Sequence, residues 1–328
     1  MDWNKLTRKK QTLDKLLSKP NAPVPQLDDW FRVELTYTSN AIEGNTLTRR
    51  ETALVVEKGL TVGGKSLIEH LEATNHAAAL DWVKQRVKRE SRAGVTPQDI
   101  LRIHGMILKG IDDDNAGRYR RVSVRIAGSA VILPNPRKVP VLMEEFYRRL
   151  RRERGLHPAQ RAAQAHYRLV TIHPFADGNG RTARLLMNMI LLQAGYPAAI
   201  IRTRDRLAYL AALEKAQLGG SQNDYETLIL QATERSLDLY LRAARGREDE
   251  QPEPEEEALL KIGKLAQKVG EPNSTIRHWT KEGLLHVADV TASGYQLYAP
   301  RMSQRIEQIR ALQKRGYTLS RIKQRLGK

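Results

Sequence analysis

Cysteine is absent from this 328-residue chain, and aromatic side chains make up only 5% of it. Without thiols the protein can form neither disulfides nor thiolate metal sites, a composition consistent with a reducing cytoplasm. No apolar run approaches the roughly 20 residues that a membrane span needs, and the first residues lack the hydrophobic region of a signal peptide. We therefore expect a cytoplasmic protein with no membrane partner, whose core is filled by Leu, Ala, Ile and Val.

Acidic residues are outnumbered in the chain as a whole, and the formal net charge is +18. The exception is 247–257, an acidic run with two prolines that cannot bury apolar surface and is therefore predicted to be a linker. Beyond it the charge reverses, because residues 258–328 hold 14 Lys and Arg against 4 Asp and Glu. Such a local excess of positive charge suits a polyanionic partner.

The segment 173–184 reads His-Pro-Phe-Ala-Asp-Gly-Asn-Gly-Arg-Thr-Ala-Arg, and it combines groups that can handle the phosphates of a nucleotide. The Gly-Asn-Gly turn at 178–180 can point successive backbone N–H groups at one anion. A helix is predicted to follow, so the turn lies at a helix N-terminus, where the dipole also favours negative charge. Arg181 and Arg184 are three residues apart on that helix, so both can reach the same anion.

Two further side chains of this segment suit the same chemistry. Asp177 can ligate a hard cation such as Mg²⁺ that bridges phosphates. His173 follows an apolar run and can take a proton from an attacking hydroxyl. A structural histidine followed by an ordinary glycine-rich turn is the alternative explanation, but the six elements at this spacing favour a site.

The segment resembles the motif of the Fic family, His-Pro-Phe-x-Asp/Glu-Gly-Asn-Gly-Arg-x-x-Arg, at every fixed position. The resemblance implies an all-helical enzyme that moves a nucleotide monophosphate, usually AMP from ATP, onto a protein hydroxyl. It implies that His173 is the general base for a Ser, Thr or Tyr hydroxyl and that Asp177 ligates Mg²⁺. Its remaining assignments are an anion hole at Gly178, Asn179 and Gly180, with Arg181 and Arg184 on the β- and γ-phosphates. Such a transfer is mostly positioning and charge neutralisation, which suits these residue types.

An upstream segment, Ser39-Asn-Ala-Ile-Glu-Gly-Asn45, resembles the inhibitory motif Ser/Thr-x-x-x-Glu-Gly/Asn of some Fic proteins. Ser39 and Glu43 are four residues apart on a predicted helix, which the following Gly-Asn pair ends. A glutamate there can pair with a guanidinium in a bidentate geometry. The resemblance implies that Glu43 pairs with Arg184, removes the partner of the γ-phosphate and leaves ATP in a non-productive pose. The alternative is a helix-end glutamate in water.

Two more features resemble parts of the Fic core. Residues 117–136 contain alternating apolar positions followed by a turn, which predicts a small β-hairpin. It resembles the Fic flap, which pairs with the target segment by backbone hydrogen bonds, and we expect docking at 131–134. The alternative is a plain surface hairpin. The helix around Tyr209 resembles the one that lines the adenine pocket, so Tyr209 is a candidate for contacting the base, unless it belongs to the core.

A competing phosphate-binding pattern, Gly-x-x-x-x-Gly-Lys-Ser, occurs at 59–66. It indicates a P-loop only where it lies between a strand and a helix. Upstream, however, Thr48 and Glu51 predict a capping box that opens a helix, with Gly59 as its C-cap. Since no buried strand is predicted to enter the segment, we interpret it as a linker between helices.

The rest of the chain before the linker is predicted to be helical. Amphipathic periodicity, helped by end signals such as an N1 proline, places helices at roughly 25–43, 66–90, 97–109, 138–153, 158–171, 180–194, 204–218 and 222–245. Five histidines lack the spacing of metal ligands and are expected to be structural or surface residues: His70, His76, His104, His157 and His166.

The basic C-terminal segment has a pattern of its own. Two predicted helices form a helix-turn-helix, and a wing and two more helices follow, at 262–270, 273–285, 291–298, 302–312 and 319–326. The segment resembles a MerR-type winged helix-turn-helix, whose second helix enters the major groove of double-stranded DNA. Ser274 and Thr275 begin that helix, and the resemblance places Arg277 on DNA and Tyr295 in support of the wing. The alternative is a basic protein-interaction domain.

Together these patterns predict a mostly α protein with a Fic-type helical core, a small β-hairpin flap and a C-terminal winged helix-turn-helix. We divide it into an N-terminal helical region (1–95), a catalytic core (96–246), the linker and a DNA-binding domain (258–328). The expected function is a Mg-ATP-dependent protein adenylyltransferase that modifies protein hydroxyls, including its own, and that is inhibited by Glu43. The reverse reaction, another transferred group and a homo-oligomer stay open. The rival function is a DNA-binding transcriptional regulator whose Fic core senses nucleotide.

Overall fold

The computed structural model describes residues 2–18, 25–90, 93–245, 259–290, 296–299 and 302–326. The chain forms two compact units, residues 1–250 and 251–328, which are described separately below. The predicted linker at 247–257 lies outside the described residues. No helix within the described ranges combines the length and the apolar composition that crossing a membrane would require.

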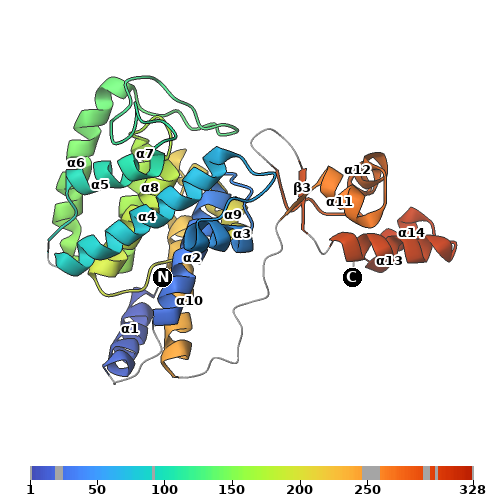
Figure 1. Cartoon of the computed structure of the whole chain (residues 1–328), viewed down its shortest axis with the longest axis horizontal. Coiled ribbons are helices and arrows are strands. Elements are labelled where there is room, and N and C mark those ends of the chain that lie inside the picture. Colours follow the sequence, from blue (N-terminus) through green and yellow to red (C-terminus); the bar gives the residue numbers. More distant parts are fainter. Residues whose placement is uncertain are drawn as a thin grey trace. The chain divides into compact units, whose positions relative to one another are not determined.

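The first unit is built from helices, as predicted (Figure 1). Their order is α1 (Trp3–Leu17), α2 (Pro25–Ile42), α3 (Arg49–Lys58), α4 (Leu67–Arg89), α5 (Pro97–Leu108), α6 (Val139–Arg152), α7 (Pro158–Ile172), α8 (Asn179–Gln193), α9 (Arg206–Gln217) and α10 (Asn223–Ala244), with 3-10 turns η1 (Pro136–Lys138), η2 (Glu153–Gly155) and η3 (Thr203–Asp205). The bounds of α2 and of α4 to α10 lie within two residues of the predicted ones.

Local end signals explain several of these bounds. Thr48 and Ser66 are the N-caps of α3 and α4, each in a reciprocal capping box with the glutamate three residues later. Gly59 ends α3 in the left-handed conformation, with φ at 64°. Residues 59–66 therefore join two helices and follow no strand, which excludes the P-loop alternative.

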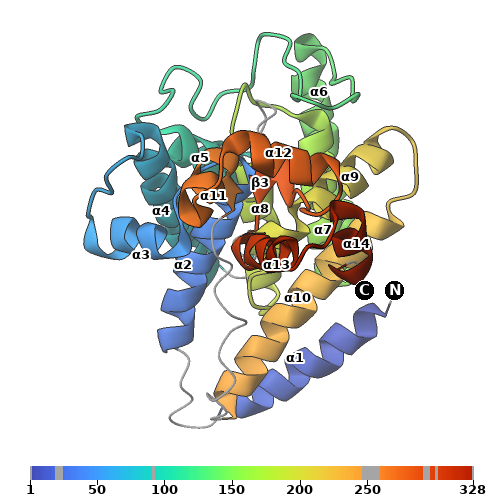
Figure 2. The same ribbon diagram turned by 90° about the vertical axis from the view of Figure 1, so that its right-hand side faces the viewer.

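The core of the first unit is centred on α8, which packs most extensively against α7 and also contacts α2, α4 and α5 (Figures 1 and 2). Almost every residue of α8 is buried. A helix that is apolar on most of its surface is stable only in such a central position. Because Arg181 and Arg184 belong to this helix, both side chains are buried. A buried charge is costly without a partner, so each guanidinium group needs hydrogen-bond or ion-pair partners in the interior.

Helix α1 was not predicted, and it lies alongside α10 (Figure 2). Its apolar face buries Leu6 and Leu13 in the main core. Lys9 forms ion pairs with Glu234 and Asp238 of α10 at 2.6 Å. The N-terminal helix therefore closes one side of the first unit.

The predicted hairpin at 117–136 differs from the structure. The segment is extended and turns where the Ser129 N–H donates to the Ile126 carbonyl at 3.2 Å, but no strand pairing is assigned within it. The prediction of a β-ladder is therefore wrong, although the turn lies where it was expected. An isolated two-stranded ribbon is at best marginally stable, and side chains of Arg120 and Glu214 hold this loop instead.

The second unit contains short strands and four helices within its described residues. They are β1 (Leu260–Lys261), α11 (Ile262–Val269), α12 (Asn273–Lys281), β2 (Asp289–Val290), β3 (Gln296–Tyr298), α13 (Met302–Lys314) and α14 (Leu319–Leu326). The strands form an antiparallel sheet in the order β1-β3-β2. Helix α12 ends four residues earlier than predicted, because Gly283 is left-handed and the Leu284 N–H turns back to the Trp279 carbonyl.

Candidate active site

His173 follows the last residue of α7 and caps the helix, with a left-handed backbone at φ 51° and ψ 60°. It is the one non-glycine residue with positive φ in the described part of the chain. This conformation costs about 1–2 kcal/mol for a residue with a side chain, so the surroundings must impose it. The His173 N–H donates to the Leu169 carbonyl at 2.9 Å, and its carbonyl accepts from Arg120 Nε at 2.7 Å.

The ring of His173 is half-buried and arranged as a base. Its Nδ1 lies 3.3 Å from the Val170 carbonyl. Because a carbonyl only accepts, Nδ1 carries the hydrogen, and Nε2 is left as the proton acceptor. Burial lowers the pKa of His173 below its ordinary value of 6.5, and the hydrogen bond to Val170 opposes this without reversing it. The imidazole is therefore neutral near pH 7.

Buried side chains brace the loop that follows. Asn179 Oδ1 accepts from the Phe175 N–H at 2.9 Å, and Asn179 Nδ2 donates to the Phe175 carbonyl at 3.0 Å. The ring of Phe175 stacks on His104 with 3.7 Å between centroids, and His104 Nε2 lies 3.0 Å from the Asp177 carbonyl. His104 therefore has a structural role, as predicted. The side chain of Asn179 is committed to the loop, which leaves its backbone N–H as the group for an anion.

Two glycines at the start of α8, Gly178 and Gly180, lie in tight surroundings. Gly178 has φ at 72°, and a Cβ there would lie 3.3 Å from the Ile107 side chain. A Cβ at Gly180 would lie 2.2 Å from Glu43 Oε1. The carboxylate of Glu43 is thus seated against the first turn of α8, where backbone N–H groups have no partner within the helix.

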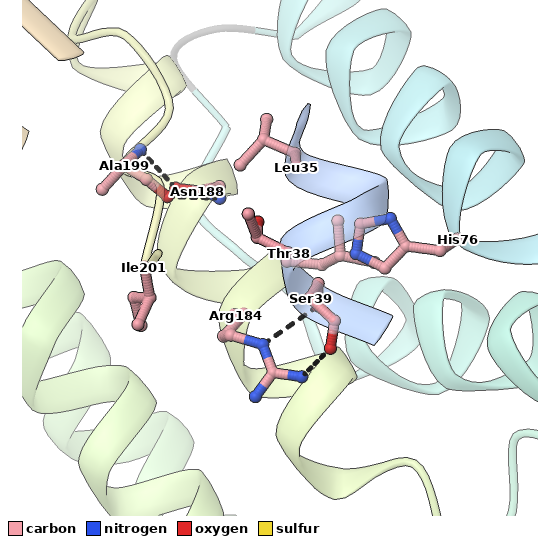
Figure 3. A pocket seen from close by; sticks show the side chains of 9 residues that line it. Leu35, Thr38, Ser39, His76, Arg184, Asn188, Ala199 and Ile201 are labelled. Carbon is pink, nitrogen blue, oxygen red and sulfur yellow. Dashed lines mark hydrogen bonds between the residues drawn. The ribbon is translucent and has the colours of Figure 1, made fainter. Parts of the chain in front are cut away.

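Arg184 binds the upstream segment 39–45 through one edge of its guanidinium group, formed by Nε and Nη2. Its Nη2 donates to the Ser39 carbonyl at 2.9 Å, and its Nε donates to Ser39 Oγ at 3.0 Å (Figure 3). The same Nη2 also donates to Glu43 Oε1 at 2.7 Å. Burial would raise the pKa of Glu43, but the neighbouring Arg184, with Arg181 and Arg206 beyond it, keeps that pKa below its ordinary value. The structure therefore brings Ser39, Glu43 and Arg184 together as a charged contact.

A small cavity lies beside this contact, between α2 and α8, with room for about one water molecule (Figure 3). It is lined by Leu35, Thr38, Ser39, His76, Arg184, Leu185, Asn188, Ala199 and Ile201. His76 Nε2 is buried and has no hydrogen-bond partner among the described residues. Burial lowers the pKa of His76 to about 3, so it is neutral and structural, as predicted. The cavity is too small for a nucleotide.

Arg181 is held by two carboxylates. Its Nη1 donates to Glu72 Oε1 at 2.7 Å, and its Nη2 donates to Asp177 Oδ2 at 3.3 Å. The guanidinium is buried, whereas 71% of the Asp177 side chain is exposed. Sequence reasoning missed Glu72, because it lies in the middle of α4 with no local pattern that marks it.

Tyr209 is 1% exposed and belongs to a buried polar chain behind Arg184. Its hydroxyl is hydrogen-bonded to Arg184 and lies 2.8 Å from His166 Nε2. Tyr225 Oη lies 2.8 Å from His166 Nδ1 and donates to the Ala163 carbonyl at 2.9 Å. Burial lowers the pKa of His166 to about 3, so the ring is neutral. The predicted base contact of Tyr209 does not fit this burial, and the alternative of a core residue does.

The base of the extended loop is tied to His173 by Arg120, which sequence reasoning also missed. Its guanidinium is buried and donates to three carbonyls, those of His173, Val122 at 3.0 Å and Pro134 at 2.6 Å. A buried arginine that donates hydrogen bonds to three carbonyls fixes the backbone of two segments at once. The loop and the histidine are therefore positioned as one piece.

The tip of the loop is tied to α9. Glu214 Oε1 accepts from Ser129 Oγ at 2.7 Å and from the Ala130 N–H at 2.9 Å. The adjacent Ile132 is 95% exposed. The strip predicted to dock a target, 131–134, therefore includes an apolar side chain that no part of the described chain covers.

In the second unit, α12 presents one polar face to solvent. Ser274, Arg277, His278 and Lys281 are exposed at helical spacing, and Thr275 is half-buried. The opposite face packs into a separate core around Ile276 and Trp279. Two of the predicted DNA contacts, Ser274 and Arg277, thus share an open face.

The predicted support of the wing, Tyr295, lies outside the described residues, as does most of the wing at 291–295. Tyr298 of β3 performs a comparable task within the described part. It is buried, and its hydroxyl lies 2.9 Å from Thr280 Oγ1 and donates to Gln296 Oε1 at 2.8 Å. Strand β3 is therefore fixed to α12 through the side chain of Tyr298, three positions after the predicted Tyr295.

Comparison with known proteins matches both units. The Fic/DOC family model matches residues 94–191, and the model of the MerR HTH family regulatory proteins matches residues 260–328. The crystal structure of a Fic domain containing signaling protein from Bacteroides thetaiotaomicron is similar with a TM-score of 0.67 and 31% identity, over 76% of this chain and 100% of that one. Fic-1 from C. elegans is similar with a TM-score of 0.64 and 30% identity, over 74% and 72%.

Curated relatives are described as protein adenylyltransferase Fic. The protein from Aedes aegypti is 36% identical over 247 residues, which is 74% of this chain and 49% of that protein. The protein from Nematostella vectensis is 38% identical over 247 residues, which is 74% of this chain and 56% of that protein. This chain thus spans about half the length of these relatives. The fold and the site define a helical protein with a Gly-Asn-Gly turn at the start of a buried helix and with a helix-turn-helix unit. The chain belongs to the Fic family and carries a MerR-type helix-turn-helix.

Proposed function

We propose that the protein is an adenylyltransferase that moves AMP from Mg-ATP to a Ser, Thr or Tyr hydroxyl, on itself or on another protein, and that Glu43 inhibits it. Membership of the Fic family and the names of the curated relatives support the transfer. The observation that carries the inhibition is the position of the Glu43 carboxylate, against Gly180 and 2.7 Å from Arg184.

The chemistry assigned to this chain's own groups is short. Nε2 of His173 accepts the proton of the target hydroxyl as the hydroxyl oxygen bonds to the α-phosphorus of ATP. The bond from that phosphorus to the oxygen bridging to the β-phosphate breaks, and pyrophosphate leaves. The N–H groups at the start of α8, with Arg181 and Arg184, offset the negative charge of the phosphates.

Asp177 is a suitable ligand for Mg²⁺. Among the described residues no cluster of three or more His, Asp or Glu side chains forms a metal cage. A single exposed carboxylate fits Mg²⁺, which keeps several waters and binds through one or two carboxylates together with substrate phosphates. The ion would supply charge neutralisation at the phosphates, and Asp177 would hold it beside Arg181.

The first test replaces Glu43. We expect Glu43→Gly to self-label strongly with ATP labelled at the α-phosphate, because Arg184 is freed and the space against Gly180 is vacated. The native chain should label weakly. Mass spectrometry of the intact protein should detect the added AMP and locate the modified hydroxyl.

The control is Glu43→Gly combined with His173→Ala, which should restore an unlabelled protein without changing its fold by circular dichroism. A Glu43→Gly protein that takes up no label with Mg-ATP, although His173 is intact, would show that the chain is not an adenylyltransferase. Incubating pre-labelled protein with the native chain tests the reverse reaction, since release of AMP would require Glu43.

We also propose that the second unit binds double-stranded DNA through the exposed face of α12. The MerR match and the local excess of positive charge support this. Using a site selected by the full chain from a random DNA pool, Arg277→Ala should weaken binding about tenfold, the cost of one good base contact. Lys314→Ala, which removes an equal charge at the exposed end of α13, should change it much less. Failure to retain any DNA would exclude this role.

The variant His173→Ala distinguishes the regulator hypothesis from the enzyme hypothesis. A regulator whose Fic core only senses nucleotide should keep promoter control in this variant while losing label transfer. An enzyme whose product controls the promoter should lose both. The comparison is made in the full chain, with DNA binding measured by fluorescence anisotropy.

A further inference from the structure

Glu72 lies between the inhibitory turn and the motif helix, and both of its carboxylate oxygens are used. Oε1 accepts from Arg181 at 2.7 Å, and Oε2 accepts from Asn45 Nδ2 at 2.9 Å. Its side chain is 17% exposed, so these contacts are largely shielded from water. Glu72 therefore connects a residue of the anion-binding motif to the segment that follows Glu43.

Asn45 fixes the turn on which Glu43 is carried. Its N–H donates to the Asn40 carbonyl at 3.1 Å, and its Oδ1 accepts from the Leu47 N–H at 2.9 Å. Asn40 in turn donates to the backbone carbonyl of Glu72 at 3.2 Å. The turn is thus bound to Glu72 through a side chain and a backbone group. It is also bound to Glu69 of α4, whose backbone carbonyl accepts from Asn45 Nδ2 at 3.0 Å and whose carboxylate accepts from the Thr46 N–H at 2.8 Å. Of these two glutamates, Glu72 is the one that also contacts Arg181.

The negative charge of Glu72 balances the positive charge of Arg181. The Arg181 guanidinium is buried, and a buried cation left without a counter-charge is costly. Asp177 is its other carboxylate, but the contact is longer, at 3.3 Å, and Asp177 is mostly exposed. Water screens an exposed partner, so Glu72 is the stronger counter-ion of the two.

We propose that Glu72 is a positioning residue that latches the Glu43 turn to the motif helix through Arg181 and Asn45, and that this latch is part of the inhibition. The proposal rests on the proposed function for its activity readout. With the latch intact, the Glu43 carboxylate stays against Arg184. With the latch broken, the turn stays attached to α4 through Glu69 but is no longer tied to Arg181, so the end of α2 and its glutamate move away from the anion site more easily.

Glu72→Gln is the sharpest change, because both partners of the carboxylate are donors. A glutamine offers one acceptor oxygen, so its NH₂ group must face another donor, either Arg181 or Asn45, and that contact is lost. The Asn45 amide keeps its other bond, to the Glu69 carbonyl. We expect self-labelling of the otherwise native chain to rise about tenfold, the effect of one lost charge-assisted hydrogen bond. In the Glu43→Gly background the same change should give no further rise.

Asp81→Asn is the matched control. Asp81 is also on α4 and also pairs with α2, accepting from Arg32 Nε at 2.9 Å and from its Nη2 at 2.8 Å, but it touches no residue of the motif. Losing this ion pair should leave self-labelling at the native level. Asn45→Ala approaches the latch from its other end and should raise labelling as Glu72→Gln does, which guards against a folding defect in one variant.

Hydrogen exchange gives a readout that needs no activity. The amides of residues 44–47 should exchange faster in Glu72→Gln than in the native chain, and Asp81→Asn should leave them unchanged. If Glu72→Gln changes neither this exchange nor the labelling while Glu43→Gly labels strongly, the latch is wrong and the proposed function stands. If Glu43→Gly itself takes up no label, the proposed function is wrong and the exchange alone decides on the latch.

Discussion

His173 owes its suitability as a base to its backbone as much as to its ring. The left-handed conformation lets one residue end α7, receive Arg120 at its carbonyl and direct Nδ1 to Val170. Burial then favours the neutral imidazole. The protonation state that proton transfer needs is therefore set before any substrate arrives.

The pH dependence of transfer follows from this. The pKa of His173 is below 6.5, so the imidazole is deprotonated above that pH and loses its capacity as a base only as pH falls through the lowered value. In Glu43→Gly the carboxylate that raises this pKa is gone, which moves the midpoint further down. We expect initial rates of self-labelling to be flat near pH 7 and to fall with a midpoint below 6.5. A midpoint above that value would contradict the burial effect.

At the scale of elements, the extended loop at 117–136 is held by side chains where a strand ladder was expected. Arg120 fixes its base to the carbonyl of His173, and Glu214 fixes its tip to α9. A loop attached at both ends can present its exposed strip in one orientation without internal strand pairing. Its order therefore depends on a few distant residues.

Removing the tip contact tests this. Glu214→Ala deletes the acceptor of both Ser129 Oγ and the Ala130 N–H. In the Glu43→Gly background we expect severalfold less transfer to a separate protein target, through a higher KM for the target, because the docking strip is no longer held. The KM for ATP should stay the same, since Glu214 touches no residue of the motif. Equal losses for both substrates would argue for a general defect.

Sequence alone predicted those elements whose signals are local. The capping boxes at Thr48 and Ser66 and the left-handed Gly59 lie within a few residues of the bounds they set. The Fic motif and the inhibitory segment were found in the same way, because each is contiguous. Glu72 and Arg120 were missed, since their roles depend on partners more than 50 residues away in the chain, at Arg181 and His173.

Helix α1 and the strand ladder illustrate the same limit for elements. Helix α1 carries a basic surface, and its stability comes from packing against α10, far along the sequence. The loop at 117–136 has the alternation of strands, but within the described residues of the first unit there is no sheet beside it to complete them. Tyr209 was assigned to a base contact by resemblance, whereas the partners that bury it, His166 and Tyr225, lie on two other helices.

For the molecule as a whole, several neutral histidines are enclosed in the first unit. His76, His104 and His166 are buried, and burial lowers their pKa values to about 3, 4 and 3. The unfolded chain therefore binds more protons than the folded one as pH falls below 6.5. Stability is present above that pH and is lost as pH falls toward the lowered values.

We expect the free energy of unfolding to drop between about pH 7 and pH 5, by up to about 1.4 kcal/mol per pH unit for each buried histidine below 6.5. Urea unfolding followed by circular dichroism at the two pH values measures this. Most carboxylates of the unfolded chain stay ionised in this window, so the histidines dominate the change. A free energy that does not change would show that these rings titrate normally in the folded protein.

Under the proposed inhibition, the position of Glu43 beside Gly180 and Arg184 also determines how the protein responds to its surroundings. A carboxylate carried on the same polypeptide competes with soluble triphosphate at a fixed effective concentration, whatever the abundance of the protein. Diluting the protein does not remove this carboxylate from the site, whereas dilution would dissociate an inhibitor supplied by a separate chain. The proposal therefore predicts a resting rate that is a property of each molecule and that follows the nucleotide concentration in the cell more closely than the number of copies of the protein.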